Sequence, residues 1–503
     1  MKRLFKQQNG IARCFYIIPG NRAFKSFIWL LFLSICIGSC RKFVQIAPPT
    51  DKVTTASVFA DNVTATAAVM NIYTNMRDNS ESFYLSQHSG LLADELQNYS
   101  SNPVLLAYYD NALSPPQSSS FPWLNAYNYI YQANAVIEGL QKYAGVLPAV
   151  KDQLLGEAKF IRAFWFFYLT NCFGDIPLPT STNYTTNSLL IRSKRSDVYS
   201  QIVADLTEAE KLLSSNYVDE TDVKTTIERV RPTKWAAASL LARTYLFKED
   251  YTNAEIQSSL VIDSAGLYSL CSNLNDVFKA NSTEAIWQLY TPTNGVSNAA
   301  TIDGQYFILT SAPIASGFFN CTTISNQLLM SFELGDQRKK NWINSYNTST
   351  DTFYFPFKYQ VYQQLPPTAP AIPPPPAEYT MVLRLAEQFL TRAEARAQQG
   401  KLIGSNSAIS DLNMIRERAG LGDYSGAADK ESELAAILHE RQVELFTEWG
   451  HRWFDLIHAG KVNEIMNVWA PQKGGEWHDY DQFYPIPLGE IIKDHNLTQN
   501  AGY

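Results

Sequence analysis

The sequence has no excess of basic residues. Its 503 residues contain 41 Lys and Arg against 48 Asp and Glu, which gives a net charge of −7 at pH 7. A surface that binds phosphate groups needs clustered Lys and Arg. This charge balance therefore argues against nucleic acid as the main partner.

Motifs of the common catalytic and metal-binding classes are missing as well. The sequence has no GxSxG, GxxxxGK[ST], GxGxxG or DxDxDG stretch. Its six cysteines form no CxxC pair, and its six histidines form no HExxH. We therefore expect no metal site, no disulfide framework and no cofactor.

The N-terminus lacks a hydrophobic run long enough for a transmembrane helix, which needs about 20 residues. Its apolar stretch runs only from Phe27 to Ile37, after a basic segment without a single acid. This pattern is typical of a signal peptide. Because Ile37-Gly38-Ser39-Cys40 resembles a bacterial lipobox, we expect residues 1–39 to be removed and Cys40 to carry the lipid anchor. An ordinary secretory signal and a retained membrane anchor are the alternatives.

Apolar residues at helical spacing dominate the rest of the chain and predict a mostly α fold. Alanine-rich stretches at 236–262 and 385–420 each resemble a tetratricopeptide hairpin, because small side chains let two helices approach closely. Thr55 or Ser57 can cap the first helix. The predicted helices outside the two hairpins span about 59–76, 121–140, 154–173, 198–213 and 434–458, the last with a possible break at Gly450.

The pattern changes between about residues 287 and 378, where Gly, Pro, Asn, Ser and aromatic residues are frequent. Gln305 to Leu309 reads as a short strand, and the proline-rich residues 365–379 predict an extended loop. We therefore expect one helical domain, residues 40–503, with a long irregular insertion and minor β structure. Loops of this length are usually functional.

Two groups of acidic residues could be taken for catalytic carboxylates. Glu440, Glu444 and Glu448 follow one helical face, but arginines lie on the same and on neighbouring predicted helices, namely Arg384, Arg416, Arg418, Arg441 and Arg452. We interpret this group as a structural ion-pair network. Asp94-Glu95 is a poor catalytic pair, because adjacent side chains project apart. His451 and His458 are seven residues apart, which favours packing over metal binding.

The lipobox and eight further stretches in a fixed order carry a resemblance to a known family. The stretches are "LLADEL", "WLNAYNYIYQANAVIEGL", "GEAKFIRAFWFFYLTNCFGDIPL", "RPTKWAAASLLARTYLF", "LRLAEQFLTRAEARAQQG", "ERQVELFTEWGHRWFDLIHAGK", "YPIPLGEI" and the closing "QNAGY". From Cys40 to Tyr503 the chain resembles the SusD/RagB family of outer-membrane nutrient-binding lipoproteins. The resemblance implies a helical scaffold with tetratricopeptide-like hairpins and a protein that is not an enzyme. It also implies a lipid-anchored protein at the cell exterior, with a SusC-like TonB-dependent transporter as partner and an oligosaccharide, or a peptide, as ligand.

The family motifs belong to the scaffold, where Glu157, Arg162, Arg452 and Asp455 are expected to hold helices and turns together. The ligand is expected to contact loops. Sugars are bound by aromatic platforms with polar side chains at their edges. The residues that offer this chemistry are Asn98, Tyr99, Gln305, Tyr306 and Phe318. A surface glycoside hydrolase and a helical-repeat scaffold that binds only protein are the alternative functions.

Overall fold

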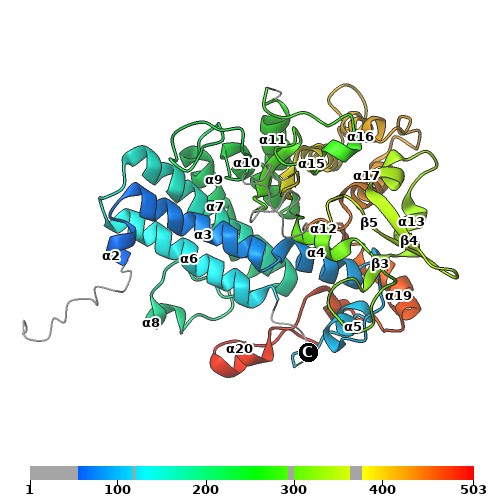
Figure 1. Ribbon diagram of the computed structural model, residues 1–503, viewed down its shortest axis with the longest axis horizontal. Helices are drawn as coiled ribbons and strands as arrows, with labels where there is room; N and C mark the ends of the chain where they lie inside the picture. The colour runs from blue at the N-terminus through cyan, green and yellow to red at the C-terminus, as the bar shows by residue number, and fades with distance from the viewer. Residues whose placement is uncertain (1–54, 117–120, 265, 293–299, 363–376) are drawn as a thin grey trace, which may run out of the picture. The chain divides into compact units, whose positions relative to one another are not determined.

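The computed structural model describes residues 55–116, 121–264, 266–292, 300–362 and 377–503 (Figure 1). The predicted signal peptide and the predicted lipidation site Cys40 lie outside these residues, as does most of the proline-rich stretch. Of the helices in the described ranges, none combines the length and apolar character that a membrane span requires.

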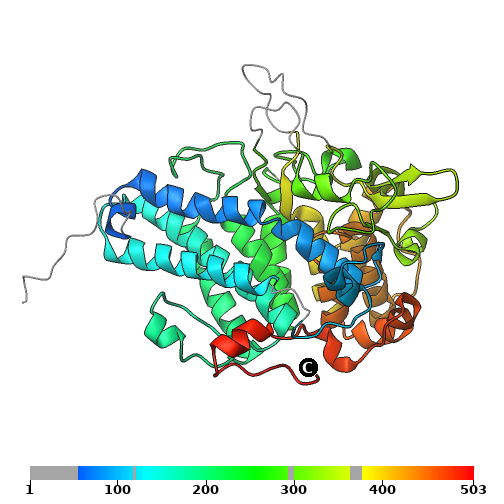
Figure 2. The ribbon, with the colours of Figure 1, turned by 60° about the horizontal axis from the view of Figure 1, so that its bottom comes forward.

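The N-terminal part is built from long helices that pack side by side. These are α3 (Asn62–Asp78), α6 (Trp123–Lys142), α7 (Pro148–Phe173) and α9 (Arg195–Leu212), and Figure 2 shows α3 running along α6. The predicted cap was wrong. Thr55 and Ser57 form the separate turn α2 (Thr55–Val58), and α3 is capped by Asp61, whose carboxylate accepts from the backbone N–H of Thr64. Asp61 lies next to the first helical residue, as an N-cap must.

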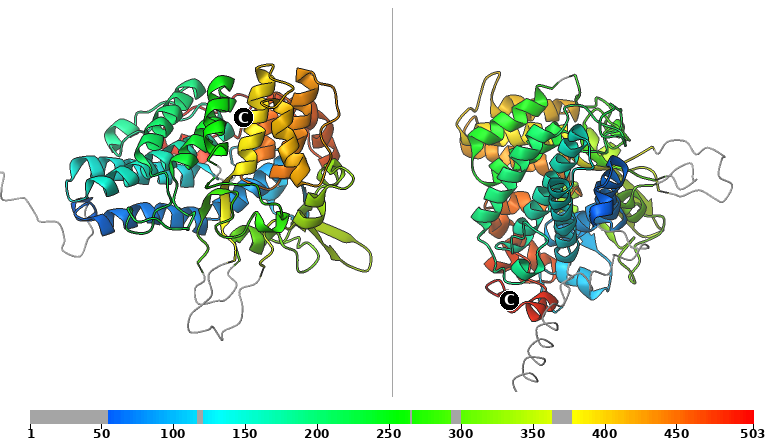
Figure 3. Two further views of the ribbon diagram at one scale, coloured as in Figure 1. Left: turned by 90° about the horizontal axis from the view of Figure 1, so that it is seen from above. Right: turned by 90° about the vertical axis from the view of Figure 1, so that its left-hand side faces the viewer.

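Helical hairpins continue from this layer. Helix α9 packs against α10 (Lys234–Phe247), which pairs with α11 (Tyr251–Ile262). The next neighbour of α11 is α15 (Leu385–Gln398), although more than a hundred residues separate them in sequence, and α15 pairs with α16 (Ala408–Arg418) (Figure 3). Ala237, Ala238 and Ala242 are fully buried on α10, as the tetratricopeptide-like pattern predicts.

The predicted helix 434–458 is two helices, α17 (Lys430–Leu445) and α18 (His451–His458). The break was expected at Gly450 but already begins at Phe446. The ammonium group of Lys358 donates to the carbonyls of Glu444 and Phe446, both at 2.8 Å, which replaces helical hydrogen bonds at this point. Gly450 then adopts φ = 75° as the N-cap of α18.

Short elements fill the region between α11 and α15. Three antiparallel pairs join β1 (Leu96–Asn98) to β3 (Thr322–Ile324), β2 (Ala285–Leu289) to β6 (Thr380–Arg384), and β4 (Ile343–Asn347) to β5 (Thr352–Pro356). The strand predicted at Gln305–Leu309 was wrong, because α12 (Ile302–Phe307) occupies most of it. Thr301 caps this helix by accepting from the N–H of Gly304 at 3.0 Å.

The remaining elements are short connections and the C-terminal helices. They are α4 (Glu81–Leu92), α5 (Pro103–Tyr109), α8 (Tyr184–Asn187), η1 (Leu274–Asp276), α13 (Asn326–Ser331), α14 (Gln337–Trp342), α19 (Val462–Lys473), η2 (Asp479–Gln482) and α20 (Leu488–Lys493).

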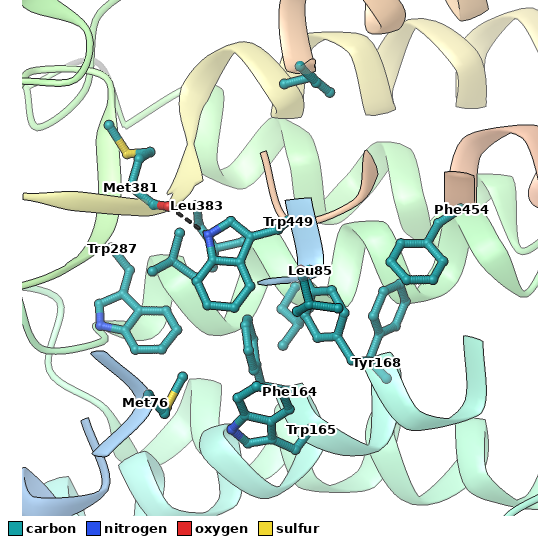
Figure 4. Packing of buried hydrophobic residues seen from close by; sticks show 14 of the residues in the cluster. Met76, Leu85, Phe164, Trp165, Tyr168, Trp287, Met381, Leu383, Trp449 and Phe454 are labelled. Carbon is teal, nitrogen blue, oxygen red and sulfur yellow. Dashed lines mark hydrogen bonds between the residues drawn. The ribbon is translucent and has the colours of Figure 1, made fainter. Parts of the chain in front are cut away.

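Large aromatic side chains fill the core where α7, β2, β6 and α18 meet (Figure 4). Phe164 packs edge-on against Trp287 and Trp449, with ring centroids 5.6 Å and 5.4 Å apart. The indole N–H of Trp449 donates to the carbonyl of Met381 at 2.7 Å, so this buried ring loses no hydrogen bond. The core therefore ties the N-terminal helices to the C-terminal hairpins.

Candidate functional site

The two predicted ligand-binding stretches, 98–99 and 305–320, lie together. Strand β1 pairs with β3, with Asn98 opposite Thr322. Beyond the pair, the N–H of Tyr99 donates to the carbonyl of Cys321 at 2.8 Å, and the hydroxyl of Ser100 donates to that of Gly317 at 2.6 Å. These bonds hold Tyr99 beside the loop that carries Phe318.

The predicted aromatic residues differ in how much of each ring is free. Tyr99 and Phe318 are 41% and 36% exposed. Tyr306 is partly buried, since its ring stacks on Phe319 with centroids 3.7 Å apart and meets Phe83 edge-on at 5.1 Å. Tyr99 and Phe318 thus present open ring surface, whereas one face of Tyr306 is covered.

The β4–β5 hairpin contributes aromatic residues that sequence reasoning missed. Phe353 meets Tyr99 edge-on, with centroids 5.5 Å apart, and lies opposite Tyr346 in the strand register. Tyr354 projects to the other face of the hairpin and is 41% exposed. The alternating stretch "TFYFPF" at 352–357 was the available signal.

The predicted polar residues have different surroundings. Asn98 uses its amide locally: its Oδ1 accepts from the N–H of Ser100 and its Nδ2 donates to the carbonyl of Ser100, both at 3.0 Å. Within the residues that the structure describes, the side-chain amide of Gln305 has no hydrogen-bond partner, and the residue is half-buried. The loop itself is held by Gln87, whose Nε2 donates to the carbonyl of Phe318 at 2.9 Å.

Asp94 and Glu95 are both buried and do not form an accessible carboxylate pair. Asp94 accepts two hydrogen bonds from the guanidinium of Arg452, at 2.8 and 2.7 Å. Burial raises the pKa of Glu95 to about 8. Arg441 makes the corresponding bidentate pair with Asp455, so Arg441 and Arg452 hold turns together, as the resemblance implied for Arg452 and Asp455.

Glu440 and Glu444 of α17 and Glu448 of the following turn form the expected ion-pair network. Some of their arginine partners differ from the expected ones. Glu440 pairs with Arg338 at 2.6 Å, and Glu448 pairs with Arg384 at 2.8 Å. Burial opposes ionisation of Glu444, but the guanidiniums of Arg418, Arg384 and Arg338 hold its pKa well below the usual range. The expectation that Arg441 and Arg452 belong to this network was wrong, because they pair with the aspartates Asp455 and Asp94.

The closest approach to a metal-ligand set in the described ranges is Glu333, His439 and Glu440. Arg416 lies among them and donates to Glu333 at 2.5 Å and to Glu440 at 3.4 Å. The Nε2 of His439 is 2.7 Å from the carbonyl of Ser331. The guanidinium of Arg416 already supplies the positive charge between the carboxylates. We therefore interpret this cluster as an ion-pair group.

Two family models match most of the chain. Residues 43–246 match a family described as "Starch-binding associating with outer membrane", and residues 341–503 match the SusD family itself. The chain belongs to the SusD/RagB family. This membership and the helical fold confirm the predicted resemblance and the mostly α class.

Proteins of similar sequence include a SusD-like protein of Formosa agariphila, which is 24% identical over 95% of this chain and 99% of its own length. The starch-binding protein SusD of Bacteroides thetaiotaomicron is 23% identical over 72% of this chain and 75% of its own. Solved structures with the same fold include a laminarin-binding SusD-like protein, with a TM-score of 0.70, 22% identity and coverage of 88% of this chain and 99% of the other. Surface glycan-binding protein A of B. thetaiotaomicron also has a TM-score of 0.70, at 19% identity over 88% and 100% of the two chains.

Proposed function

We propose that this SusD/RagB protein captures oligosaccharides at the outer membrane and delivers them to a SusC-like TonB-dependent transporter, without catalysing a reaction. One of its family models is described as starch-binding and associated with the outer membrane, and proteins of the same fold are named as laminarin-binding and glycan-binding. The observation that carries the proposal is that hydrogen bonds join the segment of Tyr99 to the loop of Phe318, and that both rings are partly exposed.

Each candidate residue has a role in this proposal. Tyr99 and Phe318 would stack on apolar sugar faces. Gln305, whose amide is free among the described residues, would bond sugar hydroxyls. Tyr306 would support the platform through its stack on Phe319, and Asn98 would fix the turn that presents Tyr99.

The lipid on Cys40 completes the proposal by anchoring the protein to the membrane, with the binding surface facing the cell exterior. Lipidation with more than one acyl chain gives stable anchoring. A tagged protein purified from detergent-solubilised outer membranes should bring down a TonB-dependent β-barrel that mass spectrometry identifies. Recovery of the tagged protein without such a barrel would contradict the delivery step.

Calorimetric titration with starch and laminarin oligosaccharides tests the binding surface. Tyr99→Ala and Phe318→Ala should each weaken the affinity about ten-fold or more, which corresponds to about 1.4 kcal/mol. Their melting temperatures should stay near that of the wild type, because an open ring contributes little packing. Tyr184→Ala is the matched control, since Tyr184 is 82% exposed on α8 and far along the chain from the platform.

Three results would point elsewhere. Unchanged glycan affinity in both platform variants would refute the assignment of the surface. Heat with a peptide panel and none with any sugar would favour peptide capture. Release of reducing ends from labelled polysaccharide by the purified protein would show an enzyme.

A further inference from the structure

A hollow lies between β1, which directly precedes Tyr99, and helices α5, α13 and α19. Its volume is about 200 Å³, and Figure 1 shows α5, α19 and β3 close to one another at the lower right. Two rings line it: Trp469, which is half-buried, and Tyr109, which is 9% exposed. A hollow of this size has room for one sugar ring rather than for a long chain.

Amide side chains surround the two rings. Gln97, Asn326, Gln327 and Gln472 all line the hollow. Gln97 contacts the hydroxyl of Tyr109. The side-chain amides of the other three have no hydrogen-bond partner in the part of the chain that the structure describes. An amide both donates and accepts, so it can bond neighbouring hydroxyl groups in either direction.

The charged residues of the hollow are already engaged. The ammonium of Lys473 donates to the carbonyls of Leu91, Leu92 and Ala93 at 2.8, 2.9 and 3.2 Å. The carboxylate of Asp94 is paired with Arg452 at 2.7 Å. Because neither charge is free for a ligand, the hollow suits an uncharged molecule rather than an anion or a cation.

We propose that this hollow is a second sugar site, which holds one uncharged sugar ring between Trp469 and the amides of Asn326, Gln327 and Gln472. Aromatic rings with convergent amides match the apolar faces and hydroxyl edges of sugars. The proposal deepens the function proposed above and rests on it for the class of ligand. The occupant is a free monosaccharide or one unit of a longer glycan.

The test reads out Trp469 directly. Fluorine NMR of the full chain labelled with 5-fluorotryptophan gives one resonance per tryptophan. The resonance that is missing in Trp469→Phe is assigned to Trp469. Glucose, galactose, mannose, maltoheptaose and laminarihexaose serve as probes. We expect at least one to shift the Trp469 resonance, and the Gln327→Ala/Gln472→Ala double variant to weaken that binding at least ten-fold. Asn467→Ala on the same helix is the control, because among the described residues the side chain of Asn467 bonds only the carbonyl of Asn463, and Asn467 does not line the hollow.

Tyr99→Ala separates the two sites. If a sugar shifts the Trp469 resonance equally in wild type and in Tyr99→Ala, the hollow binds sugar on its own. If only the longer oligosaccharides shift it, and Tyr99→Ala weakens that binding, the hollow is a subsite of the platform. The proposal is overturned if none of the five sugars shifts Trp469, if the shift persists in the double variant, or if a tryptic casein digest shifts it while the sugars do not. If only the platform assignment is wrong, sugars still shift the Trp469 resonance. The experiment therefore distinguishes a failure of the platform proposal from a failure of the second-site proposal.

Discussion

Asp303 couples the platform helix α12 to the core and should make the stability of the protein depend on pH. It is 2% exposed, and its Oδ1 accepts from the hydroxyl of Ser82 on α4 at 3.0 Å. Its Oδ2 has no partner among the described residues, and Asp303 is one of the residues that line a small cavity of about 10 Å³. Burial raises the pKa of Asp303 from 3.8 to about 7.

The sign of the effect follows from this raised pKa. The folded protein binds the proton of Asp303 more tightly than the unfolded chain does, so the stabilising contribution is complete below about pH 4 and is lost as the pH rises through about 7. The difference between 3.8 and about 7, at about 1.36 kcal/mol per pKa unit, corresponds to roughly 4 kcal/mol. Asp303→Asn keeps the Oδ1 acceptor and cannot ionise, so it should escape this loss.

Urea unfolding of both proteins between about pH 5 and pH 8 measures the effect as a difference in the free energy of unfolding. The advantage of Asp303→Asn over the wild type should grow with pH and level off above about pH 7. Glu81 and Glu95, whose pKa values burial also raises to about 8, titrate in both proteins and cancel in the difference. Asp423→Asn, at an exposed position, is the control. Profiles that stay parallel for Asp303→Asn and wild type would refute the reasoning.

Three further predictions concern the anchor, the scaffold and the ion-pair network. Cys40→Ser should move the protein from the membrane to the soluble fraction and abolish palmitate labelling, whereas membrane retention would identify the apolar run as the anchor. Ala238→Trp should cost about 1–3 kcal/mol or more by overpacking the buried seam of α10, measured as a lower melting temperature that an exposed substitution such as Glu464→Trp does not cause. Glu444→Gln should cost about 3–5 kcal/mol in urea unfolding, because Arg384 and its neighbours lose a buried counter-charge, and a cost near zero would show that the network contributes little.

The helical scaffold could be predicted because its signal is local. On α10 and α15 the apolar and alanine positions recur at helical spacing, and the same positions are buried. Long-range contacts moved the boundaries. The end of α17 depends on Lys358, which reaches the carbonyls of Glu444 and Phe446 from 86 and 88 residues away. No window of sequence around Leu445 contains that information.

The error at α12 has a different cause. The run from Gln305 to Leu309 has the aromatic and β-branched residues of a strand, and this signal outweighed the cap at Thr301 and the acid Asp303 in the first turn. Both cap signals were present in the sequence.

The partners of Arg441 and Arg452 were predicted from proximity along the chain, but buried guanidiniums pair with the carboxylate that the fold brings into bidentate geometry.

The arrangement of the two proposed sugar sites depends on the three residues of β1. Gln97 lines the hollow with Trp469, and the next residue, Asn98, folds back on Ser100 beside Tyr99 of the platform. The pairing of β1 with β3, across more than two hundred residues, therefore sets both surfaces at once. A single glycan that occupies both sites would have to match the spacing that this pairing fixes, whereas separate sugars would bind the two sites independently.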